Sequence, residues 1–487
     1  MHICLINLPR YEIHRPPLSL AVLSAICNQE EVDHSCVDLS LIIWQKLRSD
    51  FVDIDNFCIT GTIDAVVQTK LEQLIDKTVE RILQQHPETI FALSLLSVWS
   101  RPVAEMLCKS IKKLSNCEIL VGGQGLTDPV WTDLLLKQRL IDNYIVGEGE
   151  ITFKNFLHGA RTGPGINNYD FEQIDDLDLY CVIPDYRKLP ITEYLYLNSR
   201  PDLFITASRG CVRNCGYCDI KHQWKKYRYR NAKNVAEEMI TQYERHGIRD
   251  FFFTDSLING SMKMLDELCD SLIEYKQVNP EADFKWRGQY IFRPINTVKE
   301  HHIKKLAQAG VDYLIIGLET GSDRVRYDMN KKHTTDDAEW YLEMFKKYGI
   351  QCRLLMITGW VSETIEDHYD TLKLFSKWQK FVASETISGI ELGSMLTILE
   401  HSPVGQRQHD LGMTFIDNKP HAWHSSANPD LDIFERVRRR VETHKEAMKY
   451  YWPITRSLYR LDTIKRNLQE AIDGIDKHRK VIPIISS

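Results

Sequence analysis

Residues 203–224 read LFITASRGCVRNCGYCDIKHQW, an apolar strand followed at once by three cysteines within eight residues. The other nine cysteines are scattered singly, mostly in apolar stretches where a reduced thiol packs as a small hydrophobic group. Cys211, Cys215 and Cys218 are therefore the first non-random cluster in the chain. Three thiolates in so tight a loop can bind three irons of a cubane and leave the fourth iron without a protein ligand.

A zinc site is the competing interpretation of this loop. His222 lies four residues after Cys218, so Cys3His coordination is formally available. The position of the loop argues against zinc, because it follows a strand at the rim where a β/α barrel carries its chemistry. We therefore expect a [4Fe-4S] cluster with one open iron.

Strands and helices continue to alternate from this loop toward the C-terminus. The candidate strands lie at 203–210, 250–255, 284–290, 313–319, 352–359 and 387–396. Six such units over about 200 residues predict a partial TIM-type (β/α)6 barrel, residues 200–400, with its site at the carboxyl ends of the strands. We expect residues 401–487 to form a helical and loop-rich extension. Within it, 436–452 predicts an amphipathic helix with an aromatic inner face.

The N-terminal part of the chain shows a similar alternation. Its strand-like segments lie at 2–8, 34–39, 90–97, 118–123 and 144–150. This order predicts βαβ units and a parallel sheet, and we assign residues 1–162 to a Rossmann-like domain. Residues 163–199 lose the period and are predicted to be a linker. The whole chain is therefore expected to have an α/β fold.

Composition limits the class of protein. The 487 residues are enough for two or three domains, and 43% hydrophobic with 26% charged residues is ordinary for a globular protein. A net charge of −6 gives no indication of general nucleic-acid binding or of capture by an anionic membrane. The start of the chain has no signal-peptide pattern, and no apolar run is long enough to span a bilayer. We expect a cytoplasmic protein.

The cysteine spacing, with Tyr217 just before the last cysteine, resembles that of the radical SAM superfamily, and the resemblance continues over nearly the whole barrel. It implies a [4Fe-4S] cluster on the three cysteines and reductive cleavage of S-adenosylmethionine (SAM). It also implies an external one-electron donor such as flavodoxin or ferredoxin. In that family the residue matching Tyr217 lies against the adenine of SAM.

Later strand ends match the family's SAM contacts in order. The fourth strand ends in GLETGS, similar to the family's Gly-x-Glu-Ser/Thr-Gly segment, whereas the usual Gly-Gly-Glu form is absent after the second strand. The SAM contacts that the resemblance implies are Tyr217, Asp255, Ser256, Arg287, Glu319, Thr320, Gly321, Ser322 and Gly359. Structural interpretations remain: Glu319 and Arg287 could form a buried ion pair, and Gly359 could serve only a tight turn.

A Rossmann-like domain ahead of such a barrel resembles the cobalamin-binding arrangement of one large subgroup. Ligands of open α/β sheets lie across the carboxyl ends of the strands. The matching positions are Ser94, Ser97, Gly122, Gly123, Gly147 and Glu148. The chain has no Asp-x-His-x-x-Gly motif, so cobalt is expected to lack a histidine from it. The same glycines could instead serve ordinary βα turns, and Glu148 could be a first-turn helix carboxylate.

Together with the family, these features imply a cobalamin-dependent radical SAM enzyme, most simply a methyltransferase acting on an unactivated carbon. The subgroup also contains cyclases and rearrangement enzymes, which form the first alternative. A non-catalytic zinc-binding or cobalamin-binding sensor is the second. Peptides, nucleosides, lipids and small metabolites all remain open as substrates.

Overall fold

The computed structural model describes residues 1–9, 13–171, 173–196 and 200–454. The chain divides into two compact units. The first contains residues 1–205 and 228–252, and the second contains 206–227 and the residues from 253 onward. The predicted linker, 163–199, falls within the first unit, and its side chains Leu177 and Tyr186 are buried.

The first unit is built on a five-stranded parallel sheet in the order β2-β1-β3-β4-β5. The strands are β1 (His2–Asn7), β2 (Asp33–Asp38), β3 (Thr89–Ser94), β4 (Ile119–Gly122) and β5 (Asn143–Ile145). Every residue of β1 and β3 is buried, as expected for parallel strands covered on both faces. In the register, His2 lies opposite both Asp33 and Thr89. The predicted Rossmann-like alternation is confirmed.

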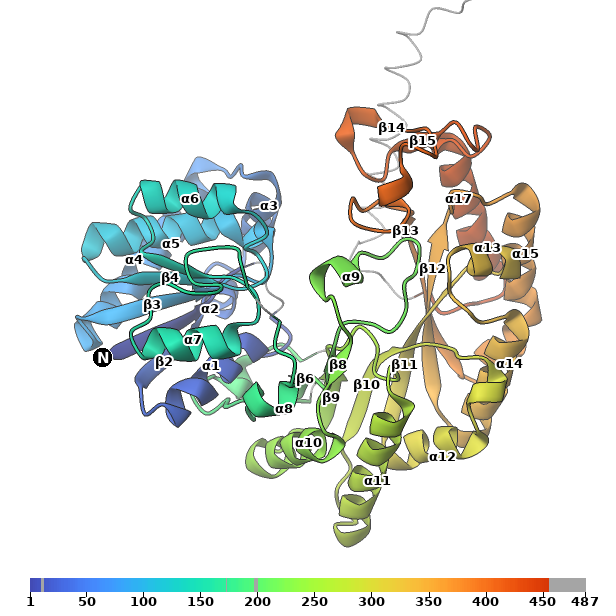
Figure 1. The fold of residues 1–487 in the computed structure, drawn as a ribbon, viewed down its shortest axis with the longest axis horizontal. Coiled ribbons are helices and arrows are strands. Elements are labelled where there is room, and N and C mark those ends of the chain that lie inside the picture. The colour runs from blue at the N-terminus through green and yellow to red at the C-terminus, as the bar shows by residue number, and fades with distance from the viewer. Residues whose placement is uncertain (10–12, 172, 197–199, 455–487) are drawn as a thin grey trace, which may run out of the picture. The chain divides into compact units, whose positions relative to one another are not determined.

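Helices cover both faces of this sheet. They are α1 (Leu18–Gln29), α2 (Leu39–Lys46), α3 (Phe51–Thr60), α4 (Ala65–Gln85), α5 (Arg101–Leu114), α6 (Pro129–Lys137), α7 (Gly149–Leu157) and α8 (Leu177–Tyr180). Figure 1 shows α4, α5 and α6 on one face and α1 and α7 on the other. Asp64 starts α4 by accepting hydrogen bonds from Val66 N and Val67 N. The carboxyl ends of the strands are therefore left open as one edge.

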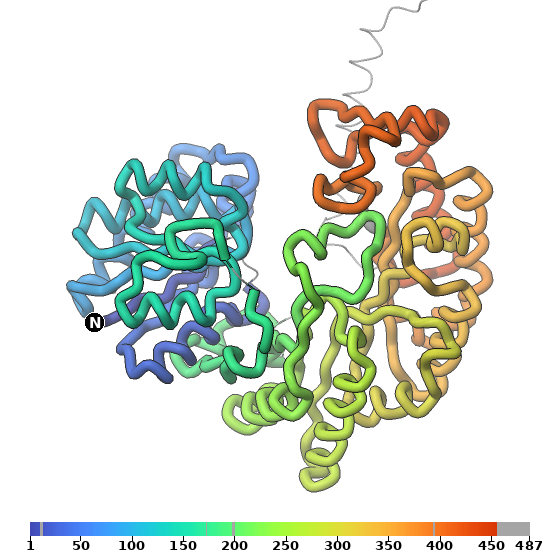
Figure 2. Tube along the Cα trace, in the orientation of Figure 1, coloured from blue at the N-terminus to red at the C-terminus, as the bar shows by residue number. Residues whose placement is uncertain are grey.

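The barrel sheet has six strands in the order β13-β12-β11-β10-β9-β6. The strands are β6 (Asp202–Ile205), β9 (Asp250–Phe253), β10 (Lys285–Tyr290), β11 (Val311–Glu319), β12 (Gln351–Thr358) and β13 (Ile387–Met395). Sequence neighbours are thus spatial neighbours, as the colour sequence in Figure 2 shows. The pairs from β10 to β13 are parallel, and β13 and β6 form the two edges, as in a partial barrel.

The chain contains further short strands and helices. They are β7 (Ser208–Arg209), β8 (Arg228–Tyr229), α9 (Ile220–Gln223), α10 (Ala232–His246), α11 (Met262–Val278), α12 (Glu300–Ala309), α13 (Asp323–Asp328), α14 (Thr335–Tyr348), α15 (Ile365–Lys377) and α16 (Gln379–Ala383). Capping boxes start both α14 and α15, from Thr334 to Asp337 and from Thr364 to Asp367. None of the helices within the described ranges is long and apolar enough to cross a membrane.

The C-terminal extension contains a hairpin that was not predicted, β14 (Met413–Phe415) with β15 (Trp423–Ser425), before α17 (Ile433–Lys449). Helix α17 confirms the expected helix, and Trp452 just beyond it is buried at 4% exposure, as an aromatic inner face requires, but the helix itself buries cationic rather than aromatic side chains. The residues that it buries are Arg436, Arg439, Thr443 and Ala447, whereas Tyr451 is 84% exposed. The inner face is cationic because each of the two arginines has a buried partner, Trp423 for Arg436 and Glu363 for Arg439. Residues 455–487 of the extension lie outside the described residues.

Candidate active site

The three clustered cysteines lie in the loop between β7 and α9, as predicted. Cys215 is buried, and Cys211 and Cys218 are half-buried. The loop turns tightly: Cys218 N donates to Cys215 O at 3.1 Å, and Arg213 N lies 3.4 Å from Cys211 Sγ. Burial raises the pKa of the Cys215 and Cys218 thiols. A cation bound there would favour their thiolate forms instead.

The spacing of the sulfur atoms distinguishes a cluster from zinc. Around a tetrahedral zinc ion, thiolate sulfurs at 2.3 Å lie about 3.8 Å from one another. The three sulfurs do not form one of the groups, among the described residues, whose ligand atoms all lie within 4.8 Å of one another. A cubane takes one thiolate on each of three irons, which needs a wider spacing. His222, the fourth zinc ligand considered, is stacked against His401 at 3.6 Å between ring centroids. The donor set fits an iron–sulfur cluster better than zinc.

A buried polar triad joins the cysteine loop to the end of β11. The Tyr217 hydroxyl donates to Glu319 Oε1 at 2.7 Å, and Lys331 Nζ donates to the same oxygen at 2.9 Å and to the Tyr217 oxygen at 3.1 Å. Burial lowers the pKa of Lys331, but the Glu319 carboxylate outweighs burial and the net direction is upward. Burial, and then the same carboxylate, raises the pKa of Tyr217 well above its usual value. The triad therefore holds a charged pair against a neutral phenol.

The backbone of β11 is adapted to this triad. Glu319 has φ +70°, a left-handed conformation that costs a non-glycine residue of order 1–3 kcal/mol. A Cβ at Gly317 would collide with the Glu319 carboxylate and lie 2.9 Å from Lys331 Nζ. The strand therefore bends Glu319 back over a position where only glycine leaves room.

The cysteine loop is fixed by neighbours from other parts of the second unit. Gly216 N donates to Met329 O at 2.9 Å, and Gly216 O accepts from Val404 N at 2.9 Å. A Cβ at Gly216 would lie 2.7 Å from the Trp360 ring, so this ring packs directly on the loop backbone. The Trp360 ring nitrogen donates to Asp328 Oδ2 at 2.6 Å. The loop is thus placed by α13, by the turn after β12 and by the C-terminal extension.

The turn after β12 rests on a buried ion pair. Glu363 Oε2 accepts from Gly359 N at 3.2 Å and Trp360 N at 3.3 Å, while Glu363 Oε1 lies 2.9 Å from Arg439 Nη1. The side chains of Arg439 and Glu363 are only 4% and 5% exposed. Burial raises the pKa of Glu363, and its hydrogen bonds with Arg439 oppose that shift. Arg436, also from α17, lies 3.6 Å above the Trp423 ring.

Gly359→Ala is expected to destabilise the protein more than Gly349→Ala. Both glycines have left-handed φ, +82° and +69°, so both substitutions carry the same backbone cost. A Cβ at Gly359 would lie 2.7 Å from the buried Arg436 side chain, whereas nothing lies within 4 Å at Gly349. We expect an additional loss of about 1–3 kcal/mol at Gly359 from overpacking. Urea unfolding measures both variants, and equal losses would contradict this packing.

Asp255 and Arg287, two further predicted SAM contacts of the barrel, are both buried. Asp255 accepts from Ser208 Oγ at 2.5 Å and Ala207 N at 3.0 Å, and burial raises its pKa to about 6. Ser256 is exposed. Arg287 is buried in β10 with its guanidinium 5.6 Å from the Tyr313 ring centroid.

Thr320, Gly321 and Ser322 lie against α15. Gly321 N and the Thr320 hydroxyl both bond Thr371 Oγ1, at 2.9 and 3.0 Å, and the Ser322 hydroxyl donates to Asp367 at 2.6 Å. These hydrogen bonds fasten the segment after β11 to α15, the helix that follows β12. The role of these residues toward SAM stays a prediction.

The positions predicted for cobalamin gather at the carboxyl edge of the first sheet. They are Ser94, Ser97, Gly122, Gly123, Gly147 and Glu148, from the ends of β3, β4 and β5. Gly123 has φ +108° and Gly147 has φ +86°, which favour glycine. Glu148, however, is paired with Arg228 at 2.6 Å and also accepts from Ile174 N at 2.6 Å. The geometry thus gives Glu148 a buried structural partner.

Sequence reasoning missed Lys331, Arg436 and Arg439. Lys331 follows α13 in the turn MNKK, where no periodicity sets it apart. The two arginines lie in a basic stretch that reads as solvent-facing. Each becomes recognisable only through its partner in the fold, Glu319, Trp423 or Glu363, which lie 12, 13 and 76 residues away in the sequence.

Comparisons with known proteins agree with this geometry. A sequence profile described as the radical SAM superfamily matches residues 205–375. An anaerobic magnesium-protoporphyrin IX monomethyl ester cyclase of Synechocystis sp. is 23% identical over 301 residues, covering 58% of this chain and 58% of the cyclase. An uncharacterised methyltransferase of Pyrococcus horikoshii is 24% identical over 394 residues, covering 77% and 76%. The chain thus spans little more than half the length of the cyclase.

A solved structure has a fold that resembles most of this chain. It is the radical S-adenosylmethionine methyltransferase TsrM from Kitasatospora setae with cobalamin and a [4Fe-4S] cluster bound. The TM-score is 0.62 at 15% identity, covering 84% of this chain and 75% of that one. At this identity the likeness shows a shared fold.

Proposed function

We propose that this chain, whose residues 205–375 match the radical SAM superfamily, is a cobalamin-dependent enzyme that methylates an unactivated carbon. The observation that carries the proposal is the three-thiol loop placed beside the buried Tyr217, Glu319 and Lys331 triad. A metal cluster with an open position and a fixed charged pair next to it can bind and orient a charged cofactor.

Cys211, Cys215 and Cys218 would hold the [4Fe-4S] cluster. When bound, the cluster supplies the electron that cleaves SAM to a 5′-deoxyadenosyl radical. The three sulfurs are not among the groups, within the described residues, whose donor atoms all lie within 4.8 Å of one another, and a single zinc ion requires a set that compact. The contacts of Gly216 with Met329, Val404 and Trp360 keep the loop in one conformation and limit the access of water.

We assign SAM to the space bordered by Tyr217, Glu319 and the turn at Gly359. Lys331 pairs with Glu319 and orients it, so that the second carboxylate oxygen can accept a hydrogen bond from the SAM amino group. The Tyr217 ring and the backbone of Gly359 and Trp360 offer an apolar surface and fixed polar atoms for adenine. Glu363 holds that backbone through both amide groups.

Cobalamin would lie at the carboxyl edge of the five-stranded sheet. A Cβ at Gly123 would collide with Leu95 O, and one at Gly125 would lie 2.6 Å from Ser97 O, so the loops that follow β3 and β4 pack closely on each other. When bound, cobalamin supplies the methyl group. The similarity to the Pyrococcus methyltransferase and to the TsrM fold supports this choice.

Anaerobic reconstitution with iron and sulfide, followed by incubation with SAM and a reductant, tests the proposal. We expect 5′-deoxyadenosine to form with or without hydroxocobalamin, and S-adenosylhomocysteine to form only when hydroxocobalamin is present. The physical reason is that methyl transfer and radical formation use SAM in two different ways. Absence of 5′-deoxyadenosine from protein with a full iron content would overturn the radical chemistry.

The similarity to the Synechocystis cyclase favours a second reaction class. A cyclase or rearrangement enzyme would bind cobalamin and form 5′-deoxyadenosine without S-adenosylhomocysteine. The same assay therefore separates the two classes. Flavodoxin or ferredoxin is our proposed electron donor, and replacing the chemical reductant with either one tests that part.

A further inference from the structure

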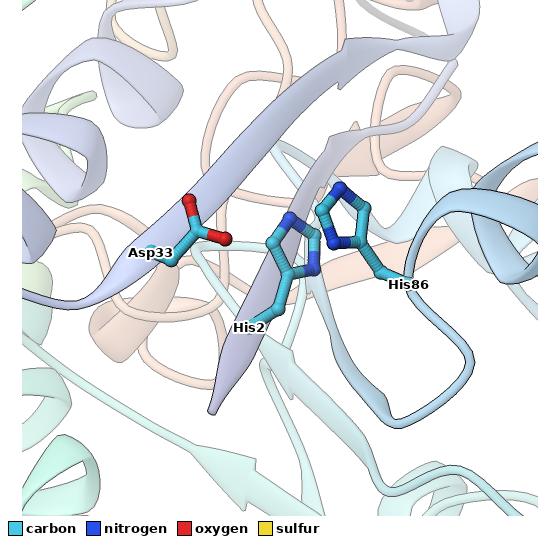
Figure 3. A group of neighbouring side chains, drawn as sticks. All are labelled: His2, Asp33 and His86. Carbon is cyan, nitrogen blue, oxygen red and sulfur yellow. The ribbon is translucent and has the colours of Figure 1, made fainter.

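A group of three side chains able to bind a metal ion lies at the amino-terminal edge of the five-stranded sheet. His2 begins β1, Asp33 begins β2, and His86 follows directly after α4. A ligand atom of each lies within 4.8 Å of those of the other two. Figure 3 shows the Asp33 carboxylate and the two imidazole rings gathered in one place. This edge is opposite to the carboxyl edge described above, because the five strands are parallel.

His2 is oriented in the way that metal-binding histidines are. Its Nδ1 lies 2.6 Å from Thr89 Oγ1, and the Thr89 hydroxyl can donate to the His2 carbonyl at 3.4 Å while it accepts from Nδ1–H. In that tautomer the lone pair is on Nε2. A ligating imidazole usually has its second nitrogen hydrogen-bonded in this manner, which fixes the ring and raises its basicity toward the metal.

The Nε2 atom of His2 is buried and has no hydrogen-bond partner, and the residue is only 8% exposed. Leaving a buried acceptor unsatisfied costs about 1–3 kcal/mol. A bound cation would satisfy it, and the exposed Asp33 carboxylate would balance the charge.

We propose that His2, His86 and Asp33 form a binding site for a borderline divalent cation, Zn²⁺. Two imidazoles and one carboxylate are donors that zinc accepts, with water in the fourth tetrahedral position. The ion would tie the starts of β1 and β2 to the end of α4. Its role would be structural, since the carboxyl edge of this sheet lies at the other end of the strands.

The two imidazole rings are stacked, with centroids 3.5 Å apart and planes 1° from parallel. Parallel rings cannot direct both lone pairs at one ion, so one ring must turn. His2 is held by Thr89, whereas His86 is half-buried and its χ2 torsion is broad. We therefore expect the His86 ring to leave the stack when the ion binds.

One other group of the described residues has comparable geometry, Asp266 with His301 and His302. Unlike the proposed site, it has no buried histidine nitrogen recorded without a hydrogen-bond partner. His302 Nδ1 is already hydrogen-bonded to Asp266 at 2.7 Å, and His301 is exposed. This group provides a matched control in which a histidine is removed from a similar set of donors.

The test is a calorimetric titration of Zn²⁺ into untagged, full-length, cluster-loaded protein under anaerobic conditions. We expect one equivalent more in the unmodified protein than in His86→Ala, and a zinc-dependent rise in the melting temperature that His86→Ala lacks. Thr89→Val keeps the side-chain shape but removes the hydroxyl, and it should weaken binding by about 10- to 100-fold. His301→Ala is expected to bind as the unmodified protein does.

A parallel titration with Co²⁺ separates this site from the cysteine loop. We expect ligand-field absorption without thiolate charge-transfer bands, and an unchanged iron content. Zinc binding that persists in both His86→Ala and Thr89→Val overturns the proposal, as does binding that is lost in His301→Ala or accompanied by thiolate bands. Thr89→Val serves as the decisive variant should His86→Ala alter the folded state by itself.

Discussion

Cys215→Ala is expected to abolish the bound cluster and, with it, all formation of 5′-deoxyadenosine from SAM. Cys215 is the most buried of the three thiols, and two remaining thiolates leave a second iron open to solvent. Cobalamin binding should persist, because the positions predicted for it lie in the first unit, whereas Cys215 lies in the second. Iron and sulfide analysis, product chromatography and retention of cobalamin on the protein measure the three effects.

Cys117→Ala is the matched control for this variant. Cys117 is a half-buried thiol of the first unit, whose Sγ lies 3.3 Å from Pro87 O. Its loss should leave the iron content and the SAM cleavage unchanged. SAM cleavage by Cys215→Ala at the rate of the unmodified protein, or zinc in place of iron in anaerobically prepared protein, would contradict the assignment of the loop.

Arg439→Leu is expected to destabilise the protein by about 3–5 kcal/mol, because it leaves a buried carboxylate without its cation. The carboxylate belongs to Glu363, which accepts both amide hydrogen bonds of the turn at Gly359 and Trp360. We also expect weaker binding of SAM, since the turn loses the group that orients it. Urea unfolding and equilibrium binding of SAM measure the two effects.

Arg438→Leu, one position earlier on α17, is the control for Arg439→Leu. It removes the same charge from the helix, but from an exposed side chain instead of a buried one. Arg438 pairs with Glu435 and Glu442 on the surface, and its side chain is 45% exposed. Exposed pairs of this kind contribute about 0–1 kcal/mol. Similar losses of stability and SAM affinity in both variants would show that the charge of α17, rather than the buried pair, is responsible.

The positions of the strands along the chain and the cysteine loop were predictable because both are local. Alternating apolar runs located the strands of both sheets, and the density of cysteines located the loop. Element ends were less exact: the expected strand at 144–150 ends at Ile145, since Gly147 turns the chain before α7. Strands β14 and β15 have three residues each, too few for an alternating pattern to be recognised.

The partners of buried charges could not be predicted. Helical periodicity finds an inner face by its hydrophobicity, and the inner face of α17 carries Arg436 and Arg439. Glu319 was expected either to contact SAM or to pair with Arg287, and in the structure Lys331 pairs with it. Such pairs depend on distant segments that fold back to one place, which no local pattern reports.

The ion pair of Glu148 with Arg228 constrains how such proteins can be recombined. Arg228 follows the cysteine loop in sequence, yet it belongs to the first unit, and the two side chains are 1% and 5% exposed. A fragment that stops at residue 199 would bury an anion without its counter-charge. A chimera that exchanges the first unit between relatives must therefore carry residues 228–252 as well. The cysteine loop, within 206–227, then behaves as an insertion in the sequence of the first unit and not as a separate module.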